Sequence, residues 1–365
     1  MGLNCGIVGL PNVGKSTIFS ALTSAPAEAA NYPFCTIEPN VGIVAVPDPR
    51  LKKIAEFIPP QKLVPASMEI VDIAGLVRGA SKGEGRGNQF LANIRETDLI
   101  IHVVRCFDDP DIVHVENRID PAGDIETINI ELALADLKTV ETRLQKNDKS
   151  VRANVPEAKA IHPVLEGLRD HLNQGLPART YPLEPDQAAA LKDLMLMTGK
   201  KTLYVCNVDE SGLDKMNDYV KTVRSIAAKE KCDVIVICGK LEAEIAALET
   251  LQDRQDFLEA AGLKESGLDQ LVRGCYHTLG LRTYFTAGET EVRAWTFHEG
   301  DKAPAAAGVI HSDFEKGFIK AEVYHFDDLV NYKSEAEIKA KGKLRIEGKE
   351  YQVKDGDIMH FRFNV

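Results

Sequence analysis

Gly9-Leu10-Pro11-Asn12-Val13-Gly14-Lys15-Ser16 is the stretch of sequence that decides the fold. It matches the pattern G-x-x-x-x-G-K-S, follows an apolar strand-like run at 3–8, and precedes a helix-like run at 16–23. In such a loop the glycines let backbone N–H groups turn toward nucleotide phosphates, while the lysine reaches the β- and γ-phosphates and the serine hydroxyl binds Mg²⁺. Strand, loop and helix in this order predict a P-loop nucleotide site formed by Asn12, Val13, Gly14, Lys15, Ser16 and Thr17.

Length and composition limit the classes of protein to which the chain can belong. Its 365 residues are 44% hydrophobic and 27% charged, which is typical of a globular protein with about two or three domains. No apolar run is long enough to cross a membrane and no secretory signal pattern is visible, so we expect a cytoplasmic protein without a membrane partner. We also expect a monomer. The seven cysteines contain no C-x-x-C pair, which argues against a disulfide framework or a zinc site. The net charge of −11 argues against binding nucleic acid over the whole surface, and we expect no sequence-specific contact with DNA.

Alternating strand-like and helix-like runs indicate an α/β domain. Apolar, β-rich runs occur at residues 41–46, 67–73, 99–105, 202–207 and 233–237. Strands that are apolar along their whole length suit a parallel sheet that is covered on both faces. We therefore assign residues 1–125 and 200–279 to one P-loop nucleotide-binding domain.

A helical insertion separates the two parts of that domain. Residues 129–147 carry apolar side chains at helical spacing, and residues 158–172 repeat them three and four apart, as in a coiled-coil seam. Pro156 suits the first turn of the second helix, and residues 187–198 form another helix-like run. We assign residues 126–199 to an inserted helical coiled-coil domain that projects as an antiparallel hairpin, with an ordinary helical layer on the sheet as the alternative.

The C-terminal part of the chain has a different pattern. From residue 280 onward, short β-rich runs are separated by turns that contain glycine and aspartate. This pattern predicts a separate β-rich domain with few helices, residues 280–365.

Three further positions have the residue types that a P-loop site needs. Thr36 lies in a loop before a strand, where its hydroxyl is a candidate ligand of Mg²⁺. Asp72 ends a strand, where its carboxylate is a candidate to bind Mg²⁺ through a water, and the Gly75 N–H is a candidate sensor of the γ-phosphate. We predict Ser16, Thr36 and Asp72 as the metal site and Lys15, Asp72 and Gly75 as catalytic residues. The many glycines after Asp72 favour a loop that is ordered by triphosphate and released after hydrolysis.

The segment Asn207-Val208-Asp209-Glu210 stands where related GTPases carry Asn-Lys-x-Asp. The aspartate of that motif accepts two hydrogen bonds from guanine, and Glu210 in its place is one methylene longer. Adenine offers an N6 donor and an N7 acceptor, a pair that an asparagine amide matches. We predict a pocket that prefers adenine, with a GTPase that tolerates Glu210 as the alternative. Its residues are Asn207, Val208, Glu210, Cys238, Gly239 and Lys240.

Together these motifs resemble those of the YchF/Obg-like ATPase family, which is related to translation-factor GTPases. The resemblance rests on residues 9–16, Thr36, residues 72–80 and the altered motif at 207–210, and residues 311–321 are similar to the signature of the family's TGS domain. It covers essentially the whole chain. It implies a Ras-like or Obg-like P-loop sheet, an inserted helical arm and a ubiquitin-like β-grasp TGS domain. It also implies Mg²⁺-dependent hydrolysis of ATP in preference to GTP, and association with ribosomes.

Hydrolysis needs a group that acts on the attacking water. Leu76 stands where Ras-like enzymes carry the glutamine that orients this water, and leucine cannot hydrogen-bond it, so we expect slow intrinsic turnover. His114 follows a polar loop beyond the end of a strand and is a candidate catalyst, whereas His102, inside an apolar strand, is expected to be a core residue. Asn12 is a candidate ligand of a K⁺ ion that would offset transition-state charge.

Several classes of function stay open on the sequence alone. The favoured class is a nucleotide-controlled ATPase switch that binds the ribosome through its large subunit or rRNA. The alternatives are a GTP-preferring translational GTPase, a non-hydrolysing adenine-nucleotide sensor that acts by binding proteins, and a small-molecule kinase, for which no acceptor pocket is visible. Basic residues of the C-terminal part are interpreted as a solvated face, with contact to rRNA as the alternative. These residues are Lys316, Lys320, Lys333, Lys339, Lys341, Lys343 and Arg345.

Overall fold

The computed structural model describes residues 4–24, 40–73, 86–112 and 118–364, with residues 86–89 described by their backbone alone. Its residues fall into two compact units. Of the described residues, the second unit contains 43–68 and 276–364, and the first unit contains the others. Within these ranges no helix is both long enough and apolar enough to span a membrane.

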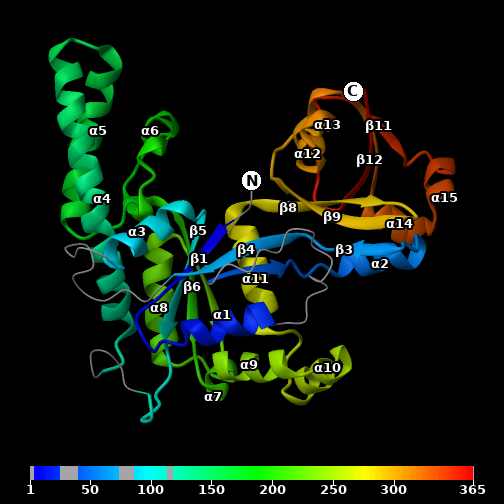
Figure 1. Cartoon of the computed structure of the whole chain (residues 1–365), viewed down its shortest axis with the longest axis horizontal. Coiled ribbons are helices and arrows are strands. Elements are labelled where there is room, and N and C mark those ends of the chain that lie inside the picture. The colour runs from blue at the N-terminus through cyan, green and yellow to red at the C-terminus, as the bar shows by residue number, and fades with distance from the viewer. Residues whose placement is uncertain (1–3, 25–39, 74–85, 113–117, 365) are drawn as a thin grey trace. The chain divides into compact units, whose positions relative to one another are not determined.

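The first unit is built around a six-stranded sheet with the order β2-β4-β1-β5-β6-β7 (Figure 1), of which residues 43–45 of β2 and 67–68 of β4 are grouped with the second unit. The five strands from β4 to β7 in this order pair in parallel. Every residue of β5 is buried, and all of β6 except its first residue is buried, as the apolar runs predicted. The strands are β1 (Asn4–Val8), β2 (Val41–Ala45), β4 (Ser67–Asp72), β5 (Leu99–Arg105), β6 (Lys201–Asn207) and β7 (Asp233–Ile237).

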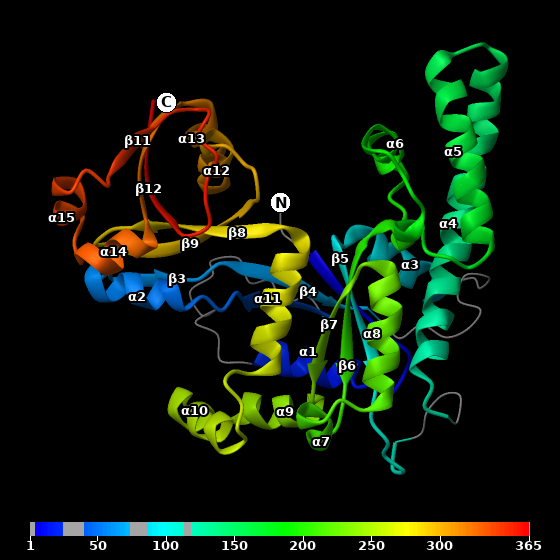
Figure 2. The same ribbon diagram turned by 180° about the vertical axis from the view of Figure 1, so that it is seen from behind.

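Helices cover both faces of this sheet (Figures 1 and 2). Tyr204 and Cys206 of β6 pack with α8 (Asp218–Glu230). A Cβ at Gly274, in α11 (Gly267–Leu279), would lie 3.4 Å from the Leu203 side chain, so alternate residues of β6 face different helices. The other helices are α1 (Lys15–Ser24), α3 (Arg86–Glu96), α7 (Glu210–Asp214), α9 (Gly239–Ala247) and α10 (Leu251–Ala260).

The helical insertion contains two long helices that lie side by side (Figure 2). α4 spans Pro121–Arg152 and α5 spans Pro156–Asn173, so the first helix is longer at both ends than the run at 129–147. The side chain of Asp120 caps α4 by accepting a hydrogen bond from the Gly123 N–H at 3.1 Å. Pro156 begins α5, as predicted. Only residues 153–155 join the two helices, which makes them an antiparallel hairpin.

The single helix predicted at 187–198 is wrong, because the structure interrupts it. α6 (Pro185–Leu191) is followed by the 3₁₀ turns η4 (Lys192–Leu194) and η5 (Met197–Gly199). Met195 between these turns has a φ of 46°. The buried carboxylate of Asp136, in α4, accepts hydrogen bonds from the N–H groups of Met197 and Thr198 at 2.9 and 2.7 Å. A contact between distant segments thus replaces bonds that a continuous helix would make.

A buried polar network fixes the base of the insertion to the sheet. Arg179 of η3 (Ala178–Thr180) forms an ion pair with Glu230 of α8 at 2.6 Å, and both side chains are less than a tenth exposed. Glu230 also accepts a hydrogen bond from the Tyr204 hydroxyl at 2.7 Å and from the Asn129 amide at 3.2 Å. Because all of these charges and dipoles have partners, their burial is tolerated.

The second unit contains a sheet with the order β11-β10-β12-β8-β9-β3. β12 (Asp357–Phe363) lies parallel to β8 (Leu281–Ala287). The pairs of β8 with β9 (Glu291–His298), of β10 (Phe318–His325) with β12, and of β10 with β11 (Arg345–Glu347) are antiparallel. α12 (Ala303–Ile310) packs three alanines against the same core as Tyr284 and Phe297. The parallel pair of β12 and β8 lies at the centre of this sheet, and the β-grasp assignment stays a prediction.

The prediction of few helices in the C-terminal part is wrong. Besides α12, this part contains α13 (Ser312–Lys316), α14 (Phe326–Tyr332) and α15 (Glu335–Ala340). Each is short and is capped by a side chain; Ser334, for example, accepts a hydrogen bond from the Glu337 N–H at 3.3 Å. Helices of five to seven residues are too short to give a clear apolar period.

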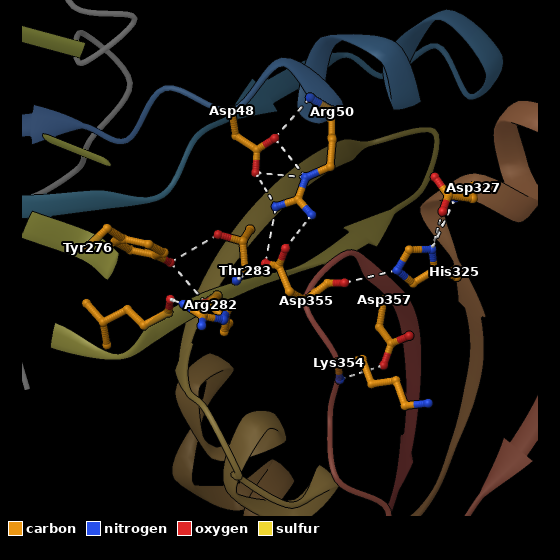
Figure 3. Close-up of polar contacts among 11 residues, drawn as sticks. Asp48, Arg50, Tyr276, Arg282, Thr283, His325, Asp327, Lys354, Asp355 and Asp357 are labelled. Carbon is orange, nitrogen blue, oxygen red and sulfur yellow. Dashed lines mark hydrogen bonds and ion pairs between the residues drawn. The ribbon is translucent and has the colours of Figure 1, made fainter. Parts of the chain in front are cut away.

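Residues 43–68 contribute α2 (Pro49–Phe57) and β3 (Lys62–Val64) to the second unit. β3 pairs in parallel with β9 at the edge of the sheet. Figure 3 shows Arg50 of α2 between two carboxylates: Nη2 lies 2.8 Å from Asp48 and Nη1 lies 2.7 Å from Asp355. Asp355 in turn accepts a hydrogen bond from the Thr283 N–H at 2.9 Å. The guanidinium therefore holds α2 on the C-terminal sheet.

Candidate nucleotide-binding site

The phosphate loop joins the end of β1 to the start of α1 in a conformation that requires glycine. Gly14 has a φ of 93° and Asn12 a φ of 63°. A Cβ at Gly14 would lie 2.1 Å from Nδ2 of Asn207, and one at Gly9 would lie 2.8 Å from the carbonyl oxygen of Val103. Backbone conformation and a close neighbour exclude a side chain at Gly14, and the adjacent strand excludes one at Gly9.

Lys15 and Asp72 form an ion pair across the site, with side chains that are 9% and 15% exposed. Lys15 is the first residue of α1 and Asp72 is the last residue of β4, so the pair connects the phosphate loop to the strand beside β1. A lysine this deeply buried needs a negative partner. The carboxylate supplies that partner here, and nucleotide phosphates would supply it when they bind.

The residues present fit a Mg²⁺ ion of the kind that P-loop enzymes bind. Ser16 is exposed in the cavity and Asp72 supplies one carboxylate. In the described ranges no group of three or more His, Cys, Asp and Glu side chains could hold a metal by itself. Mg²⁺ at phosphate sites takes one or two carboxylates and completes its shell with waters and substrate phosphates, so this small donor set suits an ion that binds together with the nucleotide.

Asn207 joins the phosphate loop to the start of α9. Its Nδ2 donates to the carbonyl oxygen of Val13 at 2.9 Å, and its Oδ1 accepts from the N–H of Gly239 at 2.9 Å. The residue is 5% exposed. Since an asparagine amide has two N–H donors and two lone pairs, these bonds use half of its hydrogen-bonding capacity. Asn207 therefore has a positioning role that the sequence analysis did not foresee, and its direct reading of adenine stays a prediction.

Glu210 and Lys240 lie opposite one another at the altered motif. The Lys240 Nζ is 3.5 Å from Oε1 of Glu210, and the two side chains are 76% and 63% exposed. An ion pair this exposed adds little to stability, but it places a cation beside the Glu210 carboxylate. Val208 and Cys238 beside them in the sequence are buried, and burial raises the pKa of the Cys238 thiol, which keeps it neutral.

One cavity of about 1150 Å³ brings most of the predicted residues together. Val13 does not line it, because its side chain is buried and its carbonyl is bound by Asn207. Asp72 does not line the cavity but forms an ion pair with Lys15, which does. Thr36, Gly75 and His114 lie outside the described residues. The predicted residues that line the cavity are Asn12, Gly14, Lys15, Ser16, Thr17, Asn207, Val208, Glu210, Cys238, Gly239 and Lys240.

The cavity has a further wall that the sequence analysis missed. Phe107, Asp108, Asp109 and Ile112, in the loop after β5, line it. Arg105, the last residue of β5, is 1% exposed and donates hydrogen bonds to carbonyl oxygens of this loop. The sequence signal that could have indicated this wall is Arg105 itself, a charged residue at the end of a mostly apolar strand.

His102 is a core residue, as predicted, and does not line the cavity. It is 2% exposed, and its ring centroid lies 5.2 Å from that of Tyr204. Burial and, secondarily, the positive charge of Arg179 lower the pKa of His102 to about 3. The imidazole is therefore neutral at physiological pH.

Comparison with known proteins agrees with this geometry. Residues 4–150 match a family model described as a 50S ribosome-binding GTPase, and residues 281–364 match the C-terminal model of YchF GTPases, described as a protein of unknown function. The chain is 54% identical over 365 residues to "Ribosome-binding ATPase YchF" of Haemophilus ducreyi, and 54% identical over 367 residues to the protein of that name from Bacillus subtilis. Both alignments cover 100% of each chain.

The chain belongs to the YchF family. The resemblance drawn from the motifs is thereby confirmed. The YchF GTPase of Schizosaccharomyces pombe has a similar structure, with a TM-score of 0.89 at 38% identity, covering 99% of this chain and 98% of that one. The predicted α/β fold class is confirmed, and as a YchF family member with this phosphate loop the chain is a P-loop NTPase.

We predict that His102→Gln removes part of the acid sensitivity of the fold. The folded-state pKa of about 3 lies below the ordinary value of 6.5, so between these values the unfolded chain binds a proton that the folded chain does not. Stability therefore falls as the pH drops below the unfolded pKa, and this contribution reaches about 2 kcal/mol at pH 5.

Urea unfolding of the wild type and His102→Gln at pH 8 and pH 5 measures this contribution. The wild type should lose about 2 kcal/mol more than the variant between the two pH values. The cost of the substitution itself cancels in this difference. Equal losses would show that His102 is not held neutral by the fold.

Proposed function

We propose that the protein is a Mg²⁺-dependent ATPase that prefers ATP to GTP, and that its nucleotide state controls association with the ribosome. The observation that carries the proposal is the single cavity lined by both the phosphate loop and the altered motif at 207–210. Lys15, paired with Asp72, lies in this cavity. The relatives from Haemophilus ducreyi and Bacillus subtilis, which align with the full length of this chain, are named as ribosome-binding ATPases. Their names support both the proposed reaction and the proposed partner.

The preference for ATP rests on the charges at the altered motif. Guanine presents two N–H donors to a carboxylate, and it would have to compete with Lys240 for Glu210. At the edge where guanine carries its N1–H donor, adenine has N1 as an acceptor, so the Lys240 ammonium at this end of the cavity is a suitable donor for adenine. Val208 replaces the lysine of the GTPase motif with a buried apolar side chain.

The proposed chemistry assigns a role to each polar group predicted in the site. Lys15 binds the β- and γ-phosphates, and the Ser16 hydroxyl and Asp72 hold Mg²⁺ together with Thr36. Bound Mg²⁺ would neutralise charge that develops on the phosphates. The Gly75 N–H contacts the γ-phosphate and His114 acts on the attacking water.

The wider expectations from the sequence belong to the same proposal. Residues 1–125 and 200–279 form the nucleotide-binding domain, 126–199 the helical arm, and 280–365 the TGS-like domain. The protein acts as a cytoplasmic monomer, and the large subunit or its rRNA is the contact on the ribosome.

We predict that the double variant Val208→Lys, Glu210→Asp shifts the ratio of ATP to GTP affinity toward GTP by about tenfold or more, since a bidentate contact to a base contributes about 1–3 kcal/mol of discrimination. Competition titrations with fluorescent ATP and GTP analogues in Mg²⁺ measure the ratio. Lys15→Ala is the control and should weaken both nucleotides. A wild type that binds GTP more tightly would overturn the preference and leave an ordinary GTPase.

We predict slow phosphate release over many turnovers, accelerated by ribosomes. Release of phosphate separates the ATPase from a sensor that binds adenine nucleotide without hydrolysis. Absence of turnover with ribosomes would favour the sensor.

We predict faster turnover in KCl than in NaCl, because Asn12 is the proposed ligand of K⁺. Asn12→Ala should remove the difference between the two salts while Mg²⁺-ATP still binds. Equal rates of the wild type in both salts would rule out the K⁺ site.

A further inference from the structure

Arg105 is a buried arginine whose role the proposed reaction does not explain. It ends β5, where every residue is buried, and it is itself 1% exposed. In the described ranges no carboxylate forms an ion pair with it. Burying a charge without a counter-charge is costly unless other dipoles compensate, so the groups around this guanidinium have to supply that compensation.

Three backbone carbonyls surround the guanidinium. Its Nε donates to the oxygen of Phe107 at 3.2 Å, Nη1 to that of Ile112 at 2.9 Å, and Nη2 to that of Asp109 at 3.1 Å. All three nitrogen atoms of the planar fork are therefore used, each on a different residue of one loop. A lysine, with a single ammonium, cannot reproduce this arrangement.

The same guanidinium supports the aromatic side chain of the loop. Its Cζ lies 4.6 Å from the centroid of the Phe107 ring, within the range of a cation–π contact. Phe107, Asp109 and Ile112, which Arg105 holds, all line the nucleotide cavity. Arg105, which does not itself line the cavity, thus fixes both the backbone and the aromatic ring of one cavity wall.

The position of this wall follows from the order of the strands. β5 lies between β1, which leads into the phosphate loop, and β6, which leads into the altered motif at 207–210. Arg105 is paired in register with Asn207, and the Cys106 N–H donates to the backbone carbonyl oxygen of Asn207 at 2.8 Å. The loop after β5 therefore begins beside the segment that is proposed to contact the base.

We propose that Arg105 is a positioning residue for recognition of the nucleoside part of the ligand, which it achieves by holding Phe107 and the loop up to Ile112 in place. It does not contact the phosphates, which the loop at 9–16 binds. This inference rests on the proposed nucleotide-binding function but not on the choice between ATP and GTP. It predicts that loss of Arg105 weakens binding of a nucleotide while binding of a bare triphosphate is retained.

Calorimetric titration of the full-length protein with ATP, GTP and inorganic tripolyphosphate, each with Mg²⁺, tests the inference in the wild type, Arg105→Met and Arg105→Lys. In Arg105→Met the affinity for the tighter nucleotide should fall about tenfold or more, as expected for one or two lost contacts. Affinity for tripolyphosphate should stay within about twofold. Arg105→Lys retains the charge but loses the planar fork of donors. Its affinity for the tighter nucleotide should therefore lie between those of the wild type and Arg105→Met.

The matched control is Arg179→Lys, which changes another buried arginine, at the base of the helical insertion and away from the cavity lining. Its ratio of nucleotide to tripolyphosphate affinity should equal that of the wild type. An equal loss of both ligands in a folded Arg105 variant, or no loss of either, would overturn the inference. If Arg105→Met fails to fold, Arg105→Lys decides. A wild type that binds no nucleotide would instead refute the proposed function.

Discussion

The two hydrogen bonds of the Asn207 side chain are the constraint on which the nucleotide site depends. They connect the carbonyl of Val13 in the phosphate loop to the N–H of Gly239 at the start of α9, each at 2.9 Å. Residues that are far apart in sequence are held in one arrangement by a single buried amide. Gly14 has no side chain, and a Cβ there would collide with this amide. The glycine of the motif and the asparagine thus depend on each other.

A buried polar side chain also holds the loop at the carboxyl end of the neighbouring strand, β5. The guanidinium of Arg105 donates hydrogen bonds to three carbonyl oxygens of the loop after β5. In the same way, the amide of Asn207 connects the phosphate loop after β1 to the start of α9 after β7. Lys15 and Asp72 connect the first helix to β4 by charge. In an open parallel sheet the ligand site lies at the carboxyl ends of the strands, and in this protein buried polar side chains at those ends determine its shape. The recognition loops are therefore held by the sheet that carries them.

Much of the fold follows from local pattern. The limits of β5 and β7 agree with their apolar runs, and the runs on either side of the P-loop motif predicted the limits of β1 and α1 to within one residue. These features depend on residues close together in sequence. The fold class and the family also followed from the motifs, because the chemistry of phosphate binding restricts both the residue types and their spacing.

What the sequence did not reveal depends on contacts between distant residues. Asp136 binds the N–H groups of Met197 and Thr198 and thereby interrupts a helix that periodicity favoured. Arg50 holds residues 43–68 on the C-terminal sheet through Asp355, a partner 305 positions away. No local period encodes either contact. The role of Arg105 was missed for the same reason, since a charge at the end of a strand has meaning only once the following loop is placed around it.

Hydrogen exchange in Asn207 variants tests most directly whether one amide holds the site together. Asn207→Asp keeps an acceptor for the Gly239 N–H but loses the donor to Val13, so exchange should accelerate in residues 9–16 and stay nearly unchanged around 239. Asn207→Ala loses both bonds, and both segments should exchange faster, while α4 and α5 serve as the internal reference. If the two variants gave the same pattern, or if neither segment changed, the central role of Asn207 would be contradicted.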